Sequence, residues 1–413
     1  LSGGTITNNL NTGIYLGLTG GSGGSGLIEN FSISGNTTGV NASNNSASTF
    51  SINNNTIFNN TSVGVYAYYN VAIQNNTIYG HIGSGDVGVY LLYNSAARNN
   101  IIHTNATGIY LSSTSSIVSG NRLYINSLYA INLEAYSTSS RIEFNFIYSN
   151  NIGIRLNNYI SSGMIVSNNL IYLNSDAAII VLGNSYLLSI TNNTIYQPAG
   201  DGIRITNNSQ NVAVKNNIIT VDAGSAITVA PDSQTNFSSD FNLFHVSGTG
   251  VVGTWQGAAR TTLLLWQSAA FSDTNSREAN PLFVDIDGAD NLLGFVAGIN
   301  RGSDDNFALQ STSPGIDAGD INSFYLSEPI NSGGRINLGH HGNTPSATAS
   351  PAVLTQVIAP NNGRPVEATR VSTVSFRAWG LSTRNPVALI SAGTSTRIDN
   401  FLPGAEYLRS GYV

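Results

Sequence analysis

The chain has 413 residues, of which 41% are hydrophobic and only 9% are charged, and its formal net charge is -6. Its single lysine, Lys215, and its few scattered arginines offer no basic surface for a nucleic acid backbone, so we exclude nucleic acid as a partner. The absence of cysteine excludes disulfides, thiol nucleophiles and thiolate metal sites. No apolar run is long enough to span a membrane, and hydrophobic content this high with charge this low predicts a folded chain.

Residues 1–239 contain a repeat that is marked by asparagine. An aliphatic or alanine side chain precedes each of these asparagines by three residues, and another aliphatic follows by two, as Ile190 and Ile195 do around Asn193. On one straight strand these two side chains would point to opposite faces. Both can point inward only if the chain bends at the asparagine, and the stacked amides of successive coils would then form a ladder. The repeat recurs at steps of 21 or 24 residues, a period typical of solenoids, at Asn55, Asn76, Asn100, Asn121, Asn145, Asn169, Asn193 and Asn217.

A second pattern follows in each repeat: glycine or alanine, an aliphatic, any residue, and another aliphatic. It reads "GVYL" at residue 88, "GIYL" at 108, "GIRL" at 153, "GIRI" at 202 and "AITV" at 226. Short strands between Asn, Gly or Ser corners are predicted, and no window has the period of a helix. These coils resemble the right-handed parallel β-helix repeats of pectate-lyase-like proteins, over about ten coils and roughly residues 1–245. The predicted fold class is all-β: a right-handed parallel β-helix solenoid followed by a small antiparallel β-sandwich-like module.

The sequence pattern changes after residue 239. Residues 240–348 contain "ANPLFVDIDGADNLLG" and "STSPGIDAGD", which resemble the C-terminal segment of large bacterial cell-surface β-helix proteins. We interpret 240–348 as irregular coils and a cap, because a solenoid must cover its last apolar layer. Residues 349–352 are predicted to be a linker. In 349–413, alternating stretches such as "STVSFRAWG" predict the β-sandwich-like module. A typical sandwich needs about 100 residues, so the module is either unusually small or incomplete.

Two rows of aromatic side chains are expected on the outside of the coils. One row consists of Phe58, Tyr79, His103, Tyr124, Tyr148, Tyr172 and Tyr196. The other consists of Tyr15, Tyr66, Tyr90 and Tyr110 before it turns polar at Asn132, Arg155 and Arg204. With coils about 4.8 Å apart, such rows could stack sugar rings or bind another fibre. The alternative is that they only stabilise the sheet beneath them.

Two acidic groups are candidates for chemistry. Asp176 and Asp201 occupy equivalent places in adjacent coils, with Arg155 and Arg204 on the following side, and paired carboxylates can divide acid and base roles in glycoside cleavage. Pectin-cleaving relatives cluster their aspartates with histidine, or with lysine and arginine, and this chain departs from both patterns. Scattered solvated charges are the alternative. The sequence "DIDGAD" places Asp285, Asp287 and Asp290 around a glycine, which suits a calcium loop or a solvated acidic turn.

The main functional hypothesis is a non-enzymatic, extracellular structural or adhesive protein, a rigid rod of a bacterial surface, fibre or sheath. A polysaccharide-cleaving enzyme and a glycan-binding spike are the alternatives, and no cofactor other than calcium is expected. The first 28 residues contain neither charge nor proline, the residues that block exposed strand edges. We therefore expect further coils or a neighbouring subunit to cover the first coil. Head-to-tail self-association through the C-terminal module would do so.

Overall fold

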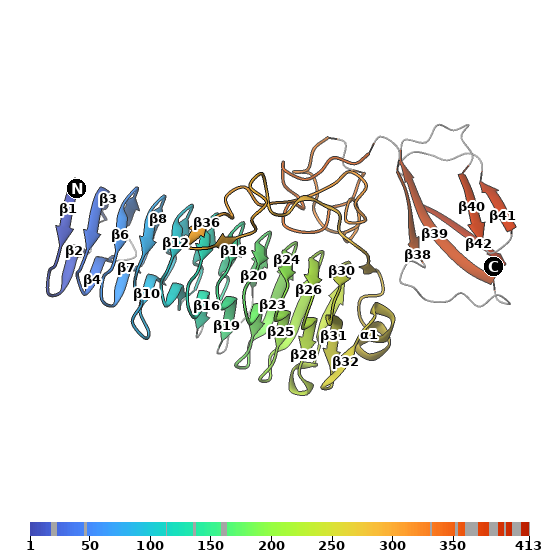
Figure 1. Ribbon diagram of the computed structural model, residues 1–413, viewed down its shortest axis with the longest axis horizontal. Coiled ribbons are helices and arrows are strands. Elements are labelled where there is room, and N and C mark those ends of the chain that lie inside the picture. The colour runs from blue at the N-terminus through green and yellow to red at the C-terminus, as the bar shows by residue number, and fades with distance from the viewer. Residues whose placement is uncertain are drawn as a thin grey trace.

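The computed structural model describes residues 1–17, 23–44, 48–112, 114–134, 138–157, 163–330 and 333–351, together with five strands beyond residue 353. Its main body is a row of stacked coils, each formed from three short parallel strands (Figure 1). The predicted all-β, right-handed parallel β-helix is confirmed.

One side of the coils is a 12-stranded sheet, parallel except at its last strand. Its third and fifth positions point inward, as Ile109 and Leu111 show, and both side chains are fully buried. The "GVYL"-type patterns lie on these strands. They are β2 (Thr12–Gly17), β4 (Thr38–Ser43), β7 (Val63–Tyr68), β10 (Val87–Leu92), β13 (Thr107–Leu111), β16 (Tyr129–Glu134), β19 (Ile152–Asn157), β22 (Ala177–Val181), β25 (Asp201–Ile205), β28 (Ser225–Val229), β31 (Val251–Trp255) and β32 (Ala258–Arg260).

The other sides form a 21-stranded sheet that is folded lengthwise into two walls. The strands β1 (Ser2–Thr7) and β3 (Ser25–Ser34) begin it, and β3 pairs with both walls. The β5 wall consists of β5 (Thr49–Asn53), β8 (Val71–Gln74), β11 (Ala96–Arg98), β14 (Ile117–Ser119), β17 (Arg141–Glu143), β20 (Met164–Ser167), β23 (Tyr186–Thr191), β26 (Gln210–Lys215) and β29 (Ser238–Asp240). The β6 wall consists of β6 (Thr56–Phe58), β9 (Thr77–Tyr79), β12 (Ile101–His103), β15 (Arg122–Tyr124), β18 (Phe146–Tyr148), β21 (Leu170–Tyr172), β24 (Thr194–Gln197), β27 (Ile218–Val221), β30 (Leu243–Val246) and β33 (Arg277–Glu278).

The chain bends between the two walls at a left-handed residue, which permits both aliphatics of the repeat to point inward. Ile190 and Ile195 are both fully buried, as predicted. The left-handed residue is Asn192, with φ of 54°, and the ladder residue Asn193 follows it. Our prediction placed the bend at Asn193 itself, which was wrong by one residue. Two successive residues therefore form the corner. The first adopts the left-handed backbone conformation, and the second directs its side-chain amide into the interior.

A short helix closes the C-terminal end of the coils. The helix α1 (Leu263–Ala270) begins at Thr262, whose side chain accepts a hydrogen bond from the backbone N–H of Leu265. Its fully buried Trp266 packs on Gly253 of β31, where any larger side chain would collide with the indole ring. A 3-10 helix (Pro231–Ser233) lies one coil earlier. The predicted all-β fold class included no helix here, although the capping threonine was a readable signal.

The rest of the predicted cap does not cover the end of the rod. Residues 281–330 and 333–348, here called the return segment, run back along the outside of the coils (Figure 1). The segment contains β34 (Phe283–Asp285), β35 (Phe295–Val296), β36 (Ile299–Asn300) and β37 (Asn306–Leu309). The end of the rod is instead closed by α1 and by the antiparallel pair of β31 and β32 that precedes it.

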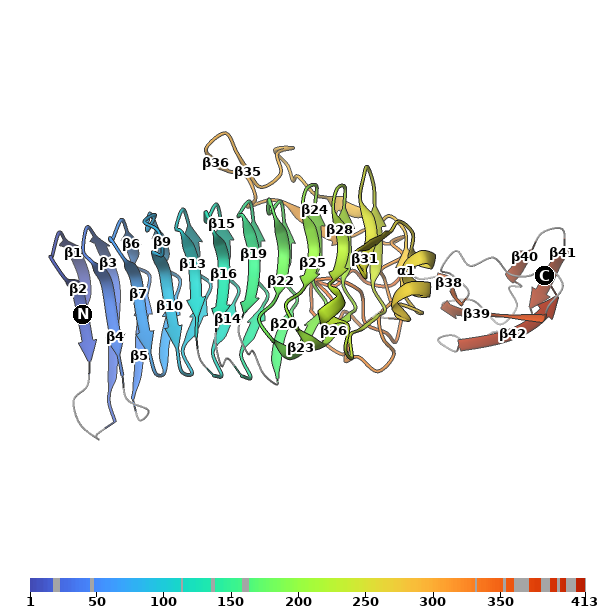
Figure 2. The ribbon, with the colours of Figure 1, turned by 90° about the horizontal axis from the view of Figure 1, so that it is seen from below.

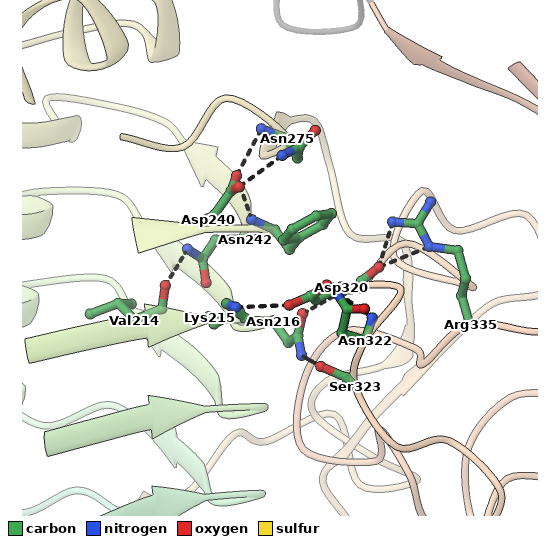
Figure 3. A network of polar contacts seen from close by, with 12 residues as sticks. Val214, Lys215, Asn216, Asp240, Asn242, Asn275, Asp320, Asn322, Ser323 and Arg335 are labelled. Atoms are coloured by element: carbon green, nitrogen blue, oxygen red, sulfur yellow. Dashed lines mark hydrogen bonds and ion pairs between the residues drawn. The ribbon is translucent and has the colours of Figure 1, made fainter. Parts of the chain in front are cut away.

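Polar contacts fix the return segment to the outside of the 21-stranded sheet (Figure 3). The Lys215 ammonium contacts the Asp320 carboxylate at 2.8 Å, and the Asn216 amide accepts a hydrogen bond from the backbone N–H of Asp320, also at 2.8 Å. The buried Arg335 donates to the carbonyl of Gly319 at 2.9 Å. Lys215 and Asn216 are the corner residues of their coil, so the return segment docks where the two walls meet.

Beyond residue 353, the described strands form two antiparallel sheets. One has the order β38 (Leu354–Ala359), β39 (Val371–Trp379) and β42 (Glu406–Tyr412), and the other pairs β40 (Val387–Ser391) with β41 (Thr394–Ile398). The small antiparallel module is therefore present, as expected from the alternation of its sequence.

Candidate functional site

The predicted asparagine ladder lies inside the fold between the two walls. Each member is at most 2% exposed. The amide of Asn145 shows the pattern: its backbone N–H and its Nδ2 both donate to Oδ1 of Asn169, at 3.0 and 2.9 Å, and Nδ2 also donates to the carbonyl of Val118. The ladder continues past Asn217 to Asn242, whose Nδ2 donates to the buried carboxylate of Asp273. It therefore has a structural role and is not available to a ligand.

A second ladder, which the sequence analysis missed, runs five residues after the first, or four residues in the case of Gln197. Its buried members are Asn36, Asn60, His81, Asn105, Asn126, Asn150, Asn174 and Gln197. Asn105 donates to Oδ1 of Asn126 from both its backbone N–H and its Nδ2, at 3.1 Å each. The signal was readable, because these residues recur with the same spacing as the first ladder.

The aromatic row on the β6 wall is real, but the return segment covers its middle. Adjacent rings stack from Phe58 to Tyr172, with centroids 4.8 to 5.3 Å apart. Tyr148 and Tyr172 are fully buried, and Tyr124 is 7% exposed. The Tyr148 hydroxyl donates to Oδ1 of Asn300 and the Tyr172 hydroxyl to Oδ2 of Asp305, both at 2.6 Å. The prediction that these three tyrosines form an outer ligand surface is therefore wrong, because the chain's own segment occupies them.

The ends of this row are less covered. Tyr79 and His103 remain partly exposed, with stacked rings 4.9 Å apart. Tyr196 is also partly exposed and lies 5.9 Å from the ring of Phe307 in the return segment. Burial raises the pKa of Tyr124 to about 12 and raises that of Tyr196, so these hydroxyls stay protonated at neutral pH.

The second row lies on the 12-stranded sheet, away from the return segment's contacts with the β6 wall. The rings of Tyr66 and Tyr90 lie 5.4 Å apart and are tilted by 31°, and Tyr90 stacks on Tyr110 at 4.7 Å. Because neighbouring rings cover one another's faces, this row offers solvent mainly its edges and hydroxyl groups. Burial raises the pKa of all three hydroxyls, which keeps them neutral.

Three further tyrosines, not singled out in the sequence, extend this surface at the turn that follows the strands. Tyr69 and Tyr93 stack at 4.5 Å, and Tyr68 meets both rings edge to face. Tyr69 and Tyr93 have φ of 60° and 37°, a left-handed conformation that bulky residues rarely adopt. We call the set Tyr66, Tyr68, Tyr69, Tyr90, Tyr93 and Tyr110 the tyrosine surface. All six are partly exposed.

Charged residues border the tyrosine surface in the next coils. The Arg155 guanidinium contacts Glu134 at 2.6 Å and donates to Oδ1 of Asn132, while the Tyr110 hydroxyl donates to Glu134 at 3.0 Å. Burial alone would raise the pKa of Glu134, but the hydrogen bonds from Arg155, Tyr110 and Asn132 outweigh it and lower the pKa. This carboxylate is therefore ionised and anchored at neutral pH.

The candidate acid–base pair is joined by an arginine. Arg204 contacts Asp176 at 2.9 Å and Asp201 at 2.8 Å. The two oxygens of Asp201 also accept from the backbone N–H of Ser225 and from the Thr228 hydroxyl. Every oxygen of the two carboxylates thus accepts a hydrogen bond, which suits an ion cluster better than a general acid. Arg155 does not join this cluster, because it pairs with Glu134.

The three aspartates of "DIDGAD" do not converge on one point. Asp290 pairs with Arg301 at 3.3 Å and accepts the backbone N–H of Leu292, whereas Asp285 lies near Asp287. In the part of the chain that the structure describes, no group of three or more histidine or acidic residues could hold a metal ion. Calcium binding stays a prediction. None of the described helices is long and apolar enough to cross a membrane.

Comparison with known proteins places this architecture in a family. The family model described as "Right handed beta helix region" matches residues 1–147 and 134–264, which is more than half of the chain. The chain belongs to the right-handed β-helix family. No curated protein matches this β-helix protein in sequence.

Several solved structures share the fold of this β-helix at low sequence identity. Pectate lyase Pel9A is 13% identical with a TM-score of 0.44, over 81% of this chain and 87% of that one. The A-module of mannuronan C-5 epimerase AlgE4 from Azotobacter vinelandii is 14% identical with a TM-score of 0.39, over 55% and 81%. The tailspike of E. coli bacteriophage HK620, in complex with a pentasaccharide, is 15% identical with a TM-score of 0.36, over 61% and 53%. The chain thus spans about half of the tailspike, and these likenesses describe the fold alone.

Proposed function

We propose that this β-helix protein is a non-enzymatic, extracellular rod that adheres to glycans through the tyrosine surface. The observation that carries the proposal is the concentration of six partly exposed tyrosines in three successive coils. Contiguous exposed aromatic surface is typical of interaction sites. Phenol rings offer apolar carbon to the CH faces of sugars and hydroxyl groups to sugar hydroxyls.

The backbone at this surface supports a binding role. Tyr69 and Tyr93 occupy left-handed positions, where glycine and asparagine are the better residues, and the equivalent positions of later coils have Gly183 and Asn207. Strained conformations of bulky residues tend to occur at functional sites. The paired charges around Glu134 and Arg204 give the neighbouring coils a fixed, nearly neutral surface.

The double variant Tyr69→Asn/Tyr93→Asn tests the proposal, because asparagine suits both left-handed positions and should preserve folding. We expect wild-type protein to bind at least one polysaccharide on a glycan array, and the double variant to lose at least about tenfold in affinity, or 1.4 kcal/mol. The matched control is Tyr186→Asn, which replaces an exposed tyrosine on the β5 wall and should bind normally.

The same polysaccharide should yield no new reducing ends or unsaturated products during incubation with the protein. Release of such products would refute the non-enzymatic part of the proposal. Equal binding by wild type and double variant would refute the role of the tyrosine surface. Self-association of the rod stays a prediction, which sedimentation of the purified protein would measure separately.

A further inference from the structure

Phe144 lies at a corner position whose backbone conformation disfavours a bulky side chain. Its φ is 59°, in the left-handed region, and it directly precedes the ladder residue Asn145. The equivalent corners of other coils are asparagine or glycine: Asn54, Asn75, Asn99, Gly120, Asn168, Asn192 and Asn216. Phenylalanine is among the residues least suited to this conformation. The residue is also 43% exposed, so packing against the core does not explain the phenylalanine.

The other phenylalanine at such a corner has a visible packing partner. Phe241, with φ of 55°, lies under the guanidinium of Arg335, which is 5.7 Å from its ring centroid. Arg335 belongs to the return segment, so Phe241 helps to dock it. Phe144 has no ring or cation contact of this kind among the described residues. Phe144 and Phe241 thus have the same left-handed backbone conformation, but only the ring of Phe241 has such a packing partner.

Phe144 lines an open cavity of about 460 Å³ between the 21-stranded sheet and the return segment. This volume is in the range of small-molecule sites. Phe144 and Phe146 supply aromatic surface from the sheet, while His341, Asn343 and Ser346 belong to the return segment. The cavity is therefore formed by two parts of the chain that are far apart in sequence.

The lining has hydrogen-bonding groups but no charged side chain. Among the described residues, the hydroxyls of Ser327 and Ser346, the ring of His341 and Nδ2 of Asn343 have no hydrogen-bond partner. Burial lowers the pKa of His341, so its ring is neutral at neutral pH and does not attract an anion. An aromatic wall opposite uncharged donors and acceptors matches one class of ligand well: a ring with an apolar face and a hydroxylated edge.

We propose that this cavity binds an uncharged sugar ring, which packs a CH face on Phe144 and Phe146 and directs its hydroxyl groups to Ser327, His341, Asn343 and Ser346. The site is separate from the tyrosine surface, and it does not depend on the function proposed above. It would let the rod hold a terminal or branching sugar beside the return segment.

The decisive variant is Phe144→Asn, which restores the residue that most other corners have. We expect its melting temperature to equal or exceed that of the wild type, because the left-handed strain is relieved. Four uncharged methyl pyranosides are tested on the wild type: the glucoside, the galactoside, the mannoside and the N-acetylglucosaminide. We expect Phe144→Asn to bind at least tenfold more weakly to each one that the wild type binds. Ligand-observed NMR and calorimetric titration measure the binding.

Two controls separate binding from folding. Phe241→Asn should lower the melting temperature, because it removes the ring under Arg335, and should leave sugar affinity unchanged. Ser346→Ala removes one hydroxyl without changing the corner, and it should weaken sugar binding. It therefore tests the proposal even if Phe144→Asn does not fold. The double variant of the tyrosine surface should bind the pyranoside normally.

Three results would overturn the proposal. One is the absence of saturable binding of every pyranoside to the wild type. Another is unchanged affinity in both Phe144→Asn and Ser346→Ala. The third is stronger binding of methyl glucuronide or of phenol than of any uncharged pyranoside, which would assign the cavity to an anionic or an aromatic ligand.

Discussion

Single residues inside this protein are held mainly by hydrogen bonds between equal positions of successive coils. Asn193 donates from its backbone N–H and its Nδ2 to Oδ1 of Asn217, at 2.8 and 3.1 Å, and also bonds the carbonyls of Val166 and Thr191. It accepts two hydrogen bonds from Asn169 in return. Since the site is fully buried, no water can replace a missing partner.

We expect Asn193→Leu to lower the free energy of unfolding by about 1 to 3 kcal/mol or more, because it leaves buried donors and acceptors without partners. Chemical denaturation measures the change. Asn53→Leu, on the outer face of β5, is the control and should change stability little. Equal stability of Asn193→Leu and the wild type would mean that the ladder contributes nothing net to folding.

His81 makes the second ladder sensitive to acid. One ring nitrogen, Nδ1, lies 2.7 Å from Oδ1 of Asn105 and must donate, while Nε2 lies 3.2 Å from Nδ2 of Asn60 and must accept. A proton on Nε2 would remove that acceptor. Burial lowers the pKa of His81, although Asn105 and Asp86 partly oppose this effect. The folded ladder therefore requires the neutral ring.

The sign of the pH dependence follows from this lowered pKa. The unfolded chain takes up a proton on His81 near pH 6.5, whereas the folded chain does so only at lower pH, so stability falls as the pH drops below about 6.5. The slope for one histidine is at most about 1.4 kcal/mol per pH unit. We expect His81→Asn to reduce the slope between pH 6.5 and 5, with the buried His340 retaining part of it. Identical slopes in denaturation at several pH values would contradict this account.

At the scale of elements, the return segment is the feature that the sequence describes least well. Its residues show no period, and its contacts join positions more than 100 residues apart, such as Lys215 and Asp320. Its docking instead depends on polar side chains at the corner between the two walls and on aromatic side chains of the β6 wall. Tyr172 is central to it, because its hydroxyl donates to Asp305, which also accepts the backbone N–H of Gly294.

We expect Tyr172→Phe to weaken the docking of the return segment by about 1.5 to 3 kcal/mol, since a hydrogen bond to a partly buried carboxylate is lost. Amide hydrogen exchange should accelerate at residues 293–309 and stay unchanged in the ladder. Tyr79→Phe is the matched control, because Tyr79 is in the same row and its hydroxyl makes no hydrogen bond within the described residues. Equal exchange in the two variants would show that ring packing alone holds the segment.

At the scale of the whole molecule, the sequence predicted most features that repeat, with the second ladder as the exception, and missed the features that occur once. The ladder asparagines and the aliphatics around them recur in the eight coils from Asn55 to Asn217, so periodicity alone predicted the coils, their inward faces and the ladder. Tyr148 and Tyr172 have the same local pattern as Tyr79, yet only the first two are buried. The difference comes from the return segment, whose path depends on long-range contacts. The left-handed conformations of Tyr69, Tyr93 and Phe144 could likewise not be predicted, because bulky residues rarely adopt that conformation.

The first ladder also gives the rod an electrical direction. From Phe31, which donates its backbone N–H to Asn55, to Asn242, each step donates toward the C-terminal end. Side-chain amides aligned in this way sum to a dipole, with its positive end at Asn242 and its negative end at Asn55. The carboxyl of Asp273 accepts the last amide hydrogen, as an acidic residue does at the positive end of an α-helix. The two ends of the ladder thus carry opposite partial charge, whatever the net charge of the chain.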